Sequence, residues 1–210
     1  PQKVIRTIGI MWTDGSLIRH TAITLGETAA SFILVILFSF LTATLLWFFH
    51  SLSEILEPWL VILNSLPKSA LAPLLIVWLG ASMRTIIVAG MSVAIFGSII
   101  SMYTAFCETD PEAMKLIYTL GGNRLQVMTQ VVCPSSLPSV ISILKVNIGL
   151  CLVGVIIGEF LAARLGLGYL IIYGSQVFKL DLVLMSIVIL CILAALMYQG
   201  IALAERRAER

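Results

Sequence analysis

Few side chains in this sequence combine a type and a position that could do chemistry. Glu159 is the most prominent, because it is an acid that follows Gly158 at the end of a long apolar run. An ionisable group at membrane depth is often functional, whereas an ion pair with Arg164, five residues on, would make Glu159 an ordinary interfacial group. Glu27 and Asn147 are weaker candidates of the same kind, and hydrogen bonds between helices would explain both.

Patterns typical of enzymes are missing from the sequence. No Gly-x-x-x-x-Gly-Lys-Ser/Thr run is present to bind ATP phosphates, and no set of a nucleophile and a general base stands out. The four cysteines lack metal-binding spacing, and His20 and His50 lie at the ends of apolar spans, where we expect them at the interface. The sequence therefore predicts no catalytic residue, no bound metal and no cofactor of its own.

The composition identifies the solvent in which this chain folds. Hydrophobic residues make up 60% of the 210 residues and charged residues only 11%, against about 25% charged in soluble domains. Such a chain cannot cover its own surface with polar groups, so we expect an integral membrane protein of the all-α class. The length favours one transmembrane domain over residues 1–210. The net charge of +2 does not bear on nucleic-acid binding, but the basic residues are scattered without a stripe, so we expect no nucleic-acid partner.

Apolar runs mark the expected membrane spans. A helix needs about 20 apolar residues to cross a hydrocarbon core of about 30 Å, and the sequence predicts about five spans on this basis. They cover residues 23–49, 56–80, 85–107, 135–160 and 182–204. The second contains three prolines and is interpreted as one kinked span, with two half-spans as the alternative. Small residues in the third and fourth spans, among them Gly90, Gly154 and Gly158, predict close helix packing.

Two segments outside these spans have their own character. In residues 1–13, apolar side chains alternate at helical spacing with the basic residues Lys3 and Arg6. This pattern predicts an interfacial helix that ends near Asp14-Gly15. Residues 160–181 are too short and too polar at their edges for a span, and we interpret them as a re-entrant or interfacial piece. The chain lacks an initiator methionine, which favours a fragment whose beginning is not given.

The segment 109–134 connects two spans, and its sequence predicts two short helices. Asp110 and Pro111 form a helix start, Glu112 adds negative charge to the first turn, and Gly121-Gly122 ends the helix after about three turns. Its apolar face is expected at Ala113, Leu116, Ile117 and Leu120. A second short helix follows, capped by Asn123, with an apolar stripe at Leu125, Met128 and Val132 and its end at Pro134. Two hinged helices of this kind suit docking onto a partner outside the bilayer, and a loop resting on lipid headgroups is the alternative.

This segment resembles the cytoplasmic loop of permeases of binding-protein-dependent ABC importers. Their loop has the form Glu-Ala-Ala, three residues, Gly, nine residues, Ile-x-Leu-Pro. Gly121, Val131 and Pro134 occupy the Gly, Ile and Pro places at the same spacing, whereas Lys115, Leu116 and Ile117 replace Glu-Ala-Ala and Cys133 replaces Leu. The segments NSLPKSALAPLLIVWLG, residues 64–80, and GLGYLI, residues 166–171, resemble the nitrate, sulfonate and taurine branch of the same family.

The resemblance implies a partnership and an orientation. It implies a type I permease that pairs with a second copy, couples to two cytoplasmic ATPase subunits that hold ATP and Mg²⁺, and receives substrate from an extracytoplasmic binding protein. The chain would be a multi-pass protein of the prokaryotic plasma membrane, with its C-terminus in the cytoplasm. The residues expected to couple to the ATPase are Glu112, Lys115, Leu116, Ile117, Gly121, Gly122, Arg124 and Pro134. Glu159 and Asn147 are the candidates for the translocation path.

The substrate is the least determined feature. The branch that the chain resembles suggests a small anion such as a sulfonate, taurine, nitrate or bicarbonate, and related permeases also move vitamin precursors. The rival class is an ion-driven secondary transporter, which would need an inverted repeat or several acids near the midplane. Neither is evident in the sequence.

Overall fold

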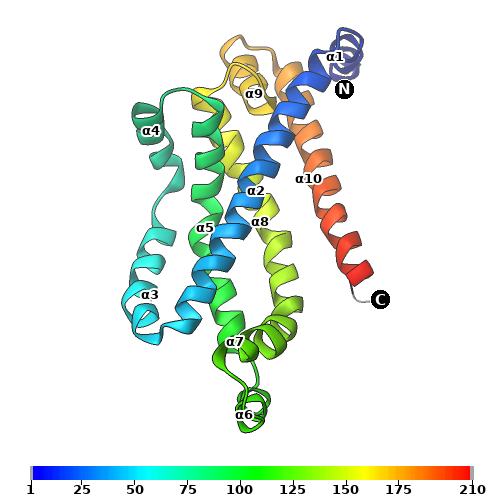
Figure 1. Ribbon diagram of the computed structural model, residues 1–210. Helices are drawn as coiled ribbons and strands as arrows, with labels where there is room; N and C mark the ends of the chain where they lie inside the picture. The colour runs from blue at the N-terminus through cyan, green and yellow to red at the C-terminus, as the bar shows by residue number, and fades with distance from the viewer. Residues whose placement is uncertain (1, 209–210) are drawn as a thin grey trace. The chain divides into compact units, whose positions relative to one another are not determined.

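The computed structural model describes residues 2–208, and every regular element in that range is helical (Figure 1). The long helices follow from the solvent, because a backbone in lipid must satisfy its own N–H and C=O groups within the segment. The elements are α1 (Gln2–Thr13), α2 (Ser16–Phe48), α3 (His50–Ser65), α4 (Lys68–Leu79), α5 (Met83–Cys107), α6 (Pro111–Thr119), α7 (Arg124–Val127), the π-helical turn η1 (Met128–Val132), α8 (Cys133–Ala162), α9 (Leu167–Gln176) and α10 (Leu180–Ala208).

Four helical stretches in the described chain are long and apolar enough to cross a membrane. They are Ser16–Phe48, Met83–Cys107, Arg124–Ala162 and Leu180–Leu203. A fifth crossing is counted only if α3 and α4 are taken together as one broken span. The prediction of an all-α membrane protein with about five spans is therefore confirmed.

Residues 56–80, expected as one kinked span or two half-spans, belong to two helices, α3 and α4, which are bent by 94° at the break between them. Both interpretations are compatible with this bend, as a broken span or as a re-entrant pair. The cause lies at Leu66 and Pro67: a proline disfavours helical geometry in the residue before it, and Leu66 is extended at φ −64° and ψ 140°. Pro58 and Pro73, by contrast, are accommodated inside α3 and α4.

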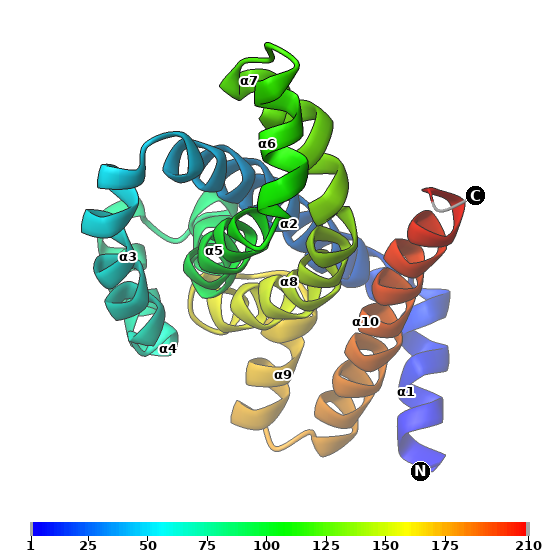
Figure 2. The ribbon, with the colours of Figure 1, turned by 90° about the horizontal axis from the view of Figure 1, so that it is seen from below.

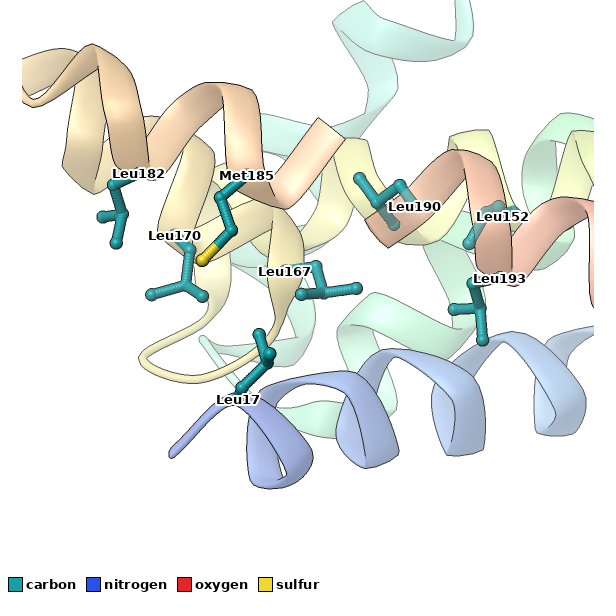
Figure 3. Packing of buried hydrophobic residues seen from close by; sticks show 8 residues of the cluster. All are labelled: Leu17, Leu152, Leu167, Leu170, Leu182, Met185, Leu190 and Leu193. Atoms are coloured by element: carbon teal, nitrogen blue, oxygen red, sulfur yellow. The ribbon is translucent and has the colours of Figure 1, made fainter. Parts of the chain in front are cut away.

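The described chain divides into two compact units. The first unit contains the residues up to Leu34, Pro67–Ala94, and the residues from Asn147 onward. Its core joins α2, α8, α9 and α10, and α10 lies between α9 and α1 in Figure 2. Figure 3 shows the eight buried side chains of this core, which are Leu17, Leu152, Leu167, Leu170, Leu182, Met185, Leu190 and Leu193.

Helix α1 has the two faces expected of an amphipathic helix. Val4, Ile8 and Met11 pack against the first unit's core, whereas Ile5 and Trp12 are exposed. The hydroxyl of Thr7 donates a 2.8 Å hydrogen bond to Asp181 at the start of α10. The helix ends where predicted, because Gly15 has φ +74° and Asp14 accepts a hydrogen bond from the Ser16 N–H. Hydrogen bonds from Ser16 hold the pKa of the Asp14 carboxyl below its usual value.

The small residues of α5 and α8 allow the close approach that the sequence predicted. A Cβ built on Gly154 would lie 2.8 Å from Gly90 Cα and 2.9 Å from the Ala89 carbonyl oxygen. A Cβ on Gly90 would lie 2.5 Å from Ser31 Oγ of α2. Larger side chains at these positions would push the helix backbones apart.

The second unit comprises Val35–Leu66 and Ile95–Val146. Its buried core consists of Ala43 of α2, Met102 and Phe106 of α5, Val127 of α7, and Met128 and Val132 of η1. Because Met114 and Ile117 of α6 pack against this core, the unit holds the segment 109–134 directly on α2 and α5.

Candidate functional site

The first helix of the segment 109–134 has well-defined ends. Asp110 Oδ1 accepts the Glu112 N–H at 2.9 Å, and Pro111 occupies the first helical position, where no N–H is needed. At the other end, the N–H of Gly121 donates to Tyr118 O and the N–H of Gly122 donates to Ile117 O. This pair of bonds is the Schellman motif, which requires positive φ, and Gly121 has φ +82°. The predicted stop at the glycine pair is confirmed.

The second helix of this segment, α7, is held by a capping box at its start and by a contact of its first residue with α2. Asn123 accepts the Gln126 N–H while Gln126 Oε1 accepts the Asn123 N–H, which forms a complete capping box. Arg124 then reaches back to α2: its Nη2 donates a 2.9 Å hydrogen bond to Trp47 O, and its guanidinium lies 5.3 Å from the Trp47 ring centroid. Arg124 therefore clamps the loop to the end of α2, a contact within the chain that the sequence did not indicate.

Pro134 does not end this helix, contrary to prediction. The chain continues through η1 into α8, and Pro134 lies exposed in the first turn of α8. The wider π turn explains how the proline is tolerated, since the N–H of Cys133 donates to Met128 O, five residues back. Such a bulge displaces the carbonyl groups that a proline ring would otherwise meet.

The residues of the predicted apolar face of α6 do not all pack inward. Ile117 packs inward together with Met114, whereas Leu116 and Leu120 are 58% and 76% exposed. On the next helix Leu125 is 60% exposed while Met128 and Val132 are buried. The loop thus presents an apolar surface, formed by Leu116, Leu120 and Leu125, that no described part of the chain covers. We call it the loop surface.

The charged members of the predicted set lie beside this surface. Glu112 is exposed in the first turn of α6, where the helix dipole favours an acid. Lys115 is exposed at a hollow of about 570 Å³, together with Trp47, Tyr103 and Tyr118. Of the eight predicted coupling residues, Ile117 is turned inward, Arg124 is engaged with α2, and Pro134 belongs to the start of α8.

The second candidate site is centred on Glu159, whose side chain is completely buried. Its carboxylate accepts the Thr24 hydroxyl at 2.6 Å and the Gly168 N–H at 2.5 Å. Thr24 Oγ1 in turn accepts the Leu167 N–H at 2.8 Å. An acid on α8 and a hydroxyl on α2 thus share the free N–H groups at the start of α9, and we call this arrangement the carboxylate node. Backbone N–H groups at a helix N-terminus are well placed to bind an anion.

The Gly-Leu-Gly segment allows the carboxylate to approach the backbone. A Cβ on Gly168 would lie 2.7 Å from Glu159 Oε2, and a Cβ on Gly166 would collide with Oε1 of the same group. Gly166 also has φ +117°, a conformation that other residues rarely adopt. The segment 160–181 therefore contains the short helix α9, whose start is held against α2 and α8 through its glycine turn.

Two expectations about neighbouring residues are wrong. Arg164 is exposed and forms no ion pair with Glu159, because the carboxylate turns toward α2 and α9. His20 is buried rather than interfacial, with Nδ1 2.9 Å from the Gly166 nitrogen, and its ring stacks on Tyr169. The spacing of His20 and Thr24, four residues apart on one helix face, was the available signal for this contact.

Glu27 extends the carboxylate node by one helical turn. It is buried, and its Oε2 has no hydrogen-bond partner among the described residues. The expected interhelical hydrogen bond of Glu27 stays a prediction. Asn147 is buried on α8.

These features define a class of protein: a multi-pass helical membrane protein whose capped helix pair, held on the spanning helices, exposes an apolar surface. The chain belongs to the family described as the binding-protein-dependent transport system inner membrane component, whose model matches residues 35–210. It is an ABC importer permease of the type I family, not itself an enzyme. ATP hydrolysis lies with a partner subunit.

Individual relatives agree with this family. The chain is 30% identical to a probable ABC transporter permease protein of Haemophilus influenzae, over 91% of this chain and 78% of that one. It is 28% identical to the formylaminopyrimidine transport permease ThiX of Halalkalibacterium halodurans, over 80% of this chain and 66% of that one. It is 25% identical to the taurine transport permease TauC of Escherichia coli, over 99% of this chain and 77% of that one.

Solved structures show the same fold. The inward-facing MetNI methionine ABC transporter aligns with a TM-score of 0.80 over 96% of this chain and 99% of the matched chain, at 20% identity. An amino acid ABC transporter aligns with a TM-score of 0.69 over 95% of this chain and 97% of the matched chain, at 15% identity.

Proposed function

We propose that this chain works as a homodimer that forms the translocation path for a small solute and couples it to two cytoplasmic ATPase subunits. An extracytoplasmic binding protein delivers the solute. The loop surface carries this proposal, because three exposed leucines on rigidly capped helices form the type of apolar ridge that inserts into a groove on a partner.

The construction of the loop fits force transmission. The Schellman end holds the helix pair in one geometry, and Arg124 ties it to the end of α2. Movement of an ATPase that grips Leu116 and Leu120 would therefore pass to α2 and α5 rather than bend the loop. Closure of the two ATPase subunits would rotate the helices and switch access between the two sides of the membrane.

Orientation follows from the same proposal. If the loop surface meets a cytoplasmic ATPase, the segment 109–134 and the C-terminus lie in the cytoplasm of a prokaryotic cell. Helix α8 is long enough to cross a bilayer, so its last residues and the start of α9 belong to the outer face. The carboxylate node then works as a fixed joint near the outer end of the path, and Asn147 is a polar position farther along α8.

For the substrate we propose a small organic or inorganic anion such as a sulfonate, taurine, nitrate or bicarbonate. The taurine permease among the relatives supports this choice. The formylaminopyrimidine and riboflavin permeases support the alternative, a vitamin or its precursor.

A single-cysteine experiment tests the coupling and the orientation together. In a variant whose four native cysteines are replaced, Lys115→Cys is crosslinked in native membranes, and Ser175→Cys on exposed α9 is the matched control. We expect Lys115→Cys to capture an ATPase subunit and to resist an impermeant thiol reagent added outside, which should label Ser175→Cys. Capture of lipid or self-adducts alone, at a site reached from the cytoplasm, would overturn the docking role.

A further inference from the structure

The hollow of about 570 Å³ beside α6 and α7 lies at the ends of two spanning helices, and no step of the proposed function uses it. Its wall includes Trp47 in the last turn of α2 and Cys107 at the end of α5. All of its lining residues belong to the second unit. Because α2 and α5 both stop here after an apolar stretch long enough to cross a bilayer, the hollow falls at the depth of the lipid headgroups.

Two permanent cations line this hollow, and none of its lining residues is an aspartate or glutamate. Lys115 of α6 is exposed and forms no ion pair within the described part of the chain. Arg124 of α7 donates one N–H to Trp47 O, and a guanidinium group carries five such donors. His50, also on the wall, lies 3.5 Å from Glu54, an acid outside the lining. The wall therefore offers positive charge and hydrogen-bond donors to an anion.

Aromatic side chains accompany these cations. Trp47 and Tyr103 come from the ends of the spanning helices, and Tyr118 comes from α6. Tryptophan and tyrosine gather at membrane interfaces because the apolar ring contacts acyl chains while the N–H or O–H group reaches water. A hollow with basic and aromatic residues at the ends of spanning helices is typical of a site for an anionic lipid headgroup.

The hollow and the loop surface occupy different faces of α6. Pro111, Lys115 and Tyr118 line the hollow and recur at intervals of four and three residues, so they share one side of the helix. Leu116 and Leu120 lie on another side, where they are exposed. A partner can therefore engage the leucines of the loop surface without filling the hollow.

We propose that this hollow binds the phosphate group of an anionic phospholipid such as phosphatidylglycerol. The phosphate oxygens accept hydrogen bonds from Lys115 and from the remaining N–H groups of Arg124. Phosphatidylcholine has the same phosphate but carries a compensating quaternary ammonium, so a wall with two cations favours the anionic lipid. The bound lipid takes no part in carrying the solute. It joins α6 and α7 to the end of α2 and so adds to the contact that Arg124 makes with Trp47.

Quenching of Trp47 fluorescence by brominated lipid measures occupancy at the hollow itself. The full chain keeps Trp47, while its three other tryptophans, which are exposed, are replaced by phenylalanine. The protein is reconstituted into phosphatidylcholine vesicles that contain either phosphatidylglycerol or phosphatidylcholine brominated near the headgroup end of the acyl chain. We expect the anionic lipid to bind beside Trp47 at least five times more strongly than phosphatidylcholine. Equal quenching by the two lipids would overturn the proposal.

Substitutions at Lys115 test whether its charge selects the lipid. Lys115→Gln should lower the preference for phosphatidylglycerol about fivefold, because one cation at a lipid surface contributes about that factor. Lys115→Arg should retain the preference. The control Lys179→Gln removes an equal charge from an exposed position outside the hollow and should leave the preference unchanged. The same preference in Lys115→Gln and Lys179→Gln would contradict the assignment.

Two additions to the same vesicles distinguish a lipid from other ligands. Millimolar glycerol phosphate, compared with sodium chloride at matched ionic strength, should not relieve the quenching by phosphatidylglycerol. Relief would assign the hollow to a soluble phosphate compound instead. The ATPase subunit, once bound to the permease, should leave the preference for the anionic lipid intact. Loss of that preference would assign the hollow to the interface between the two proteins.

Discussion

Removing the Thr24 hydroxyl tests the carboxylate node most directly. Thr24→Val keeps the shape of the buried side chain but removes the 2.6 Å hydrogen bond to Glu159 and the acceptor of the Leu167 N–H. A hydrogen bond to a charged group contributes about 1.5–3 kcal/mol, and a buried N–H without a partner costs about 1–3 kcal/mol. We therefore expect the attachment of α9 to lose about 3 kcal/mol.

The structure also offers a matched control for this variant. Thr28 lies one turn along the same helix and is equally buried, but its hydroxyl donates only to the Thr24 carbonyl oxygen. The backbone N–H four residues on already satisfies that carbonyl in a helix, so Thr28→Val should cost less than about 1 kcal/mol.

Hydrogen exchange measured by mass spectrometry reads the difference locally. Each 1.4 kcal/mol changes the opening equilibrium about tenfold, so exchange in the first turn of α9 should accelerate about a hundredfold in Thr24→Val. Thr28→Val should exchange nearly as the unsubstituted protein does. Equal exchange of α9 in the two variants would refute the claim that Thr24 and Glu159 together hold this helix.

Two further substitutions test the packing and the loop. Gly154→Val should lower the thermal midpoint in detergent by roughly 6–12 °C, because the new Cβ meets backbone atoms of Gly90 and Ala89. Overpacking of this kind costs about 3 kcal/mol. The control Gly149→Val, with open space around its Cβ, should change the thermal midpoint little. Arg124→Ala should speed Lys-C cleavage at Lys115 about fivefold, since it removes the contacts of Arg124 with Trp47, which are worth about 1 kcal/mol. Gln130→Ala on the same loop is the control. Equal cleavage rates in the two variants would count against the clamp.

The sequence alone determined the local features of this protein. The uncharged run between Glu27 and Glu54 predicted a spanning helix because backbone groups in lipid have no other partners. The ends of α6 were predictable because Asp110-Pro111 and Gly121-Gly122 act through their own and neighbouring backbone atoms. These interactions extend over a few residues, so one stretch of sequence contains all of their causes.

Only the tertiary structure decided the contacts between distant segments. Glu159 was a candidate from its position, but its partner was Thr24, 135 residues away, rather than Arg164. The partial burial of Ile117 and the exposure of Leu116 depend on where α2 and α5 present their surface, and helical periodicity predicts a face without saying what covers it. The physical reason is the same in each case: a side chain's partner is set by the packing of whole helices, and a single sequence carries that information only as spacing.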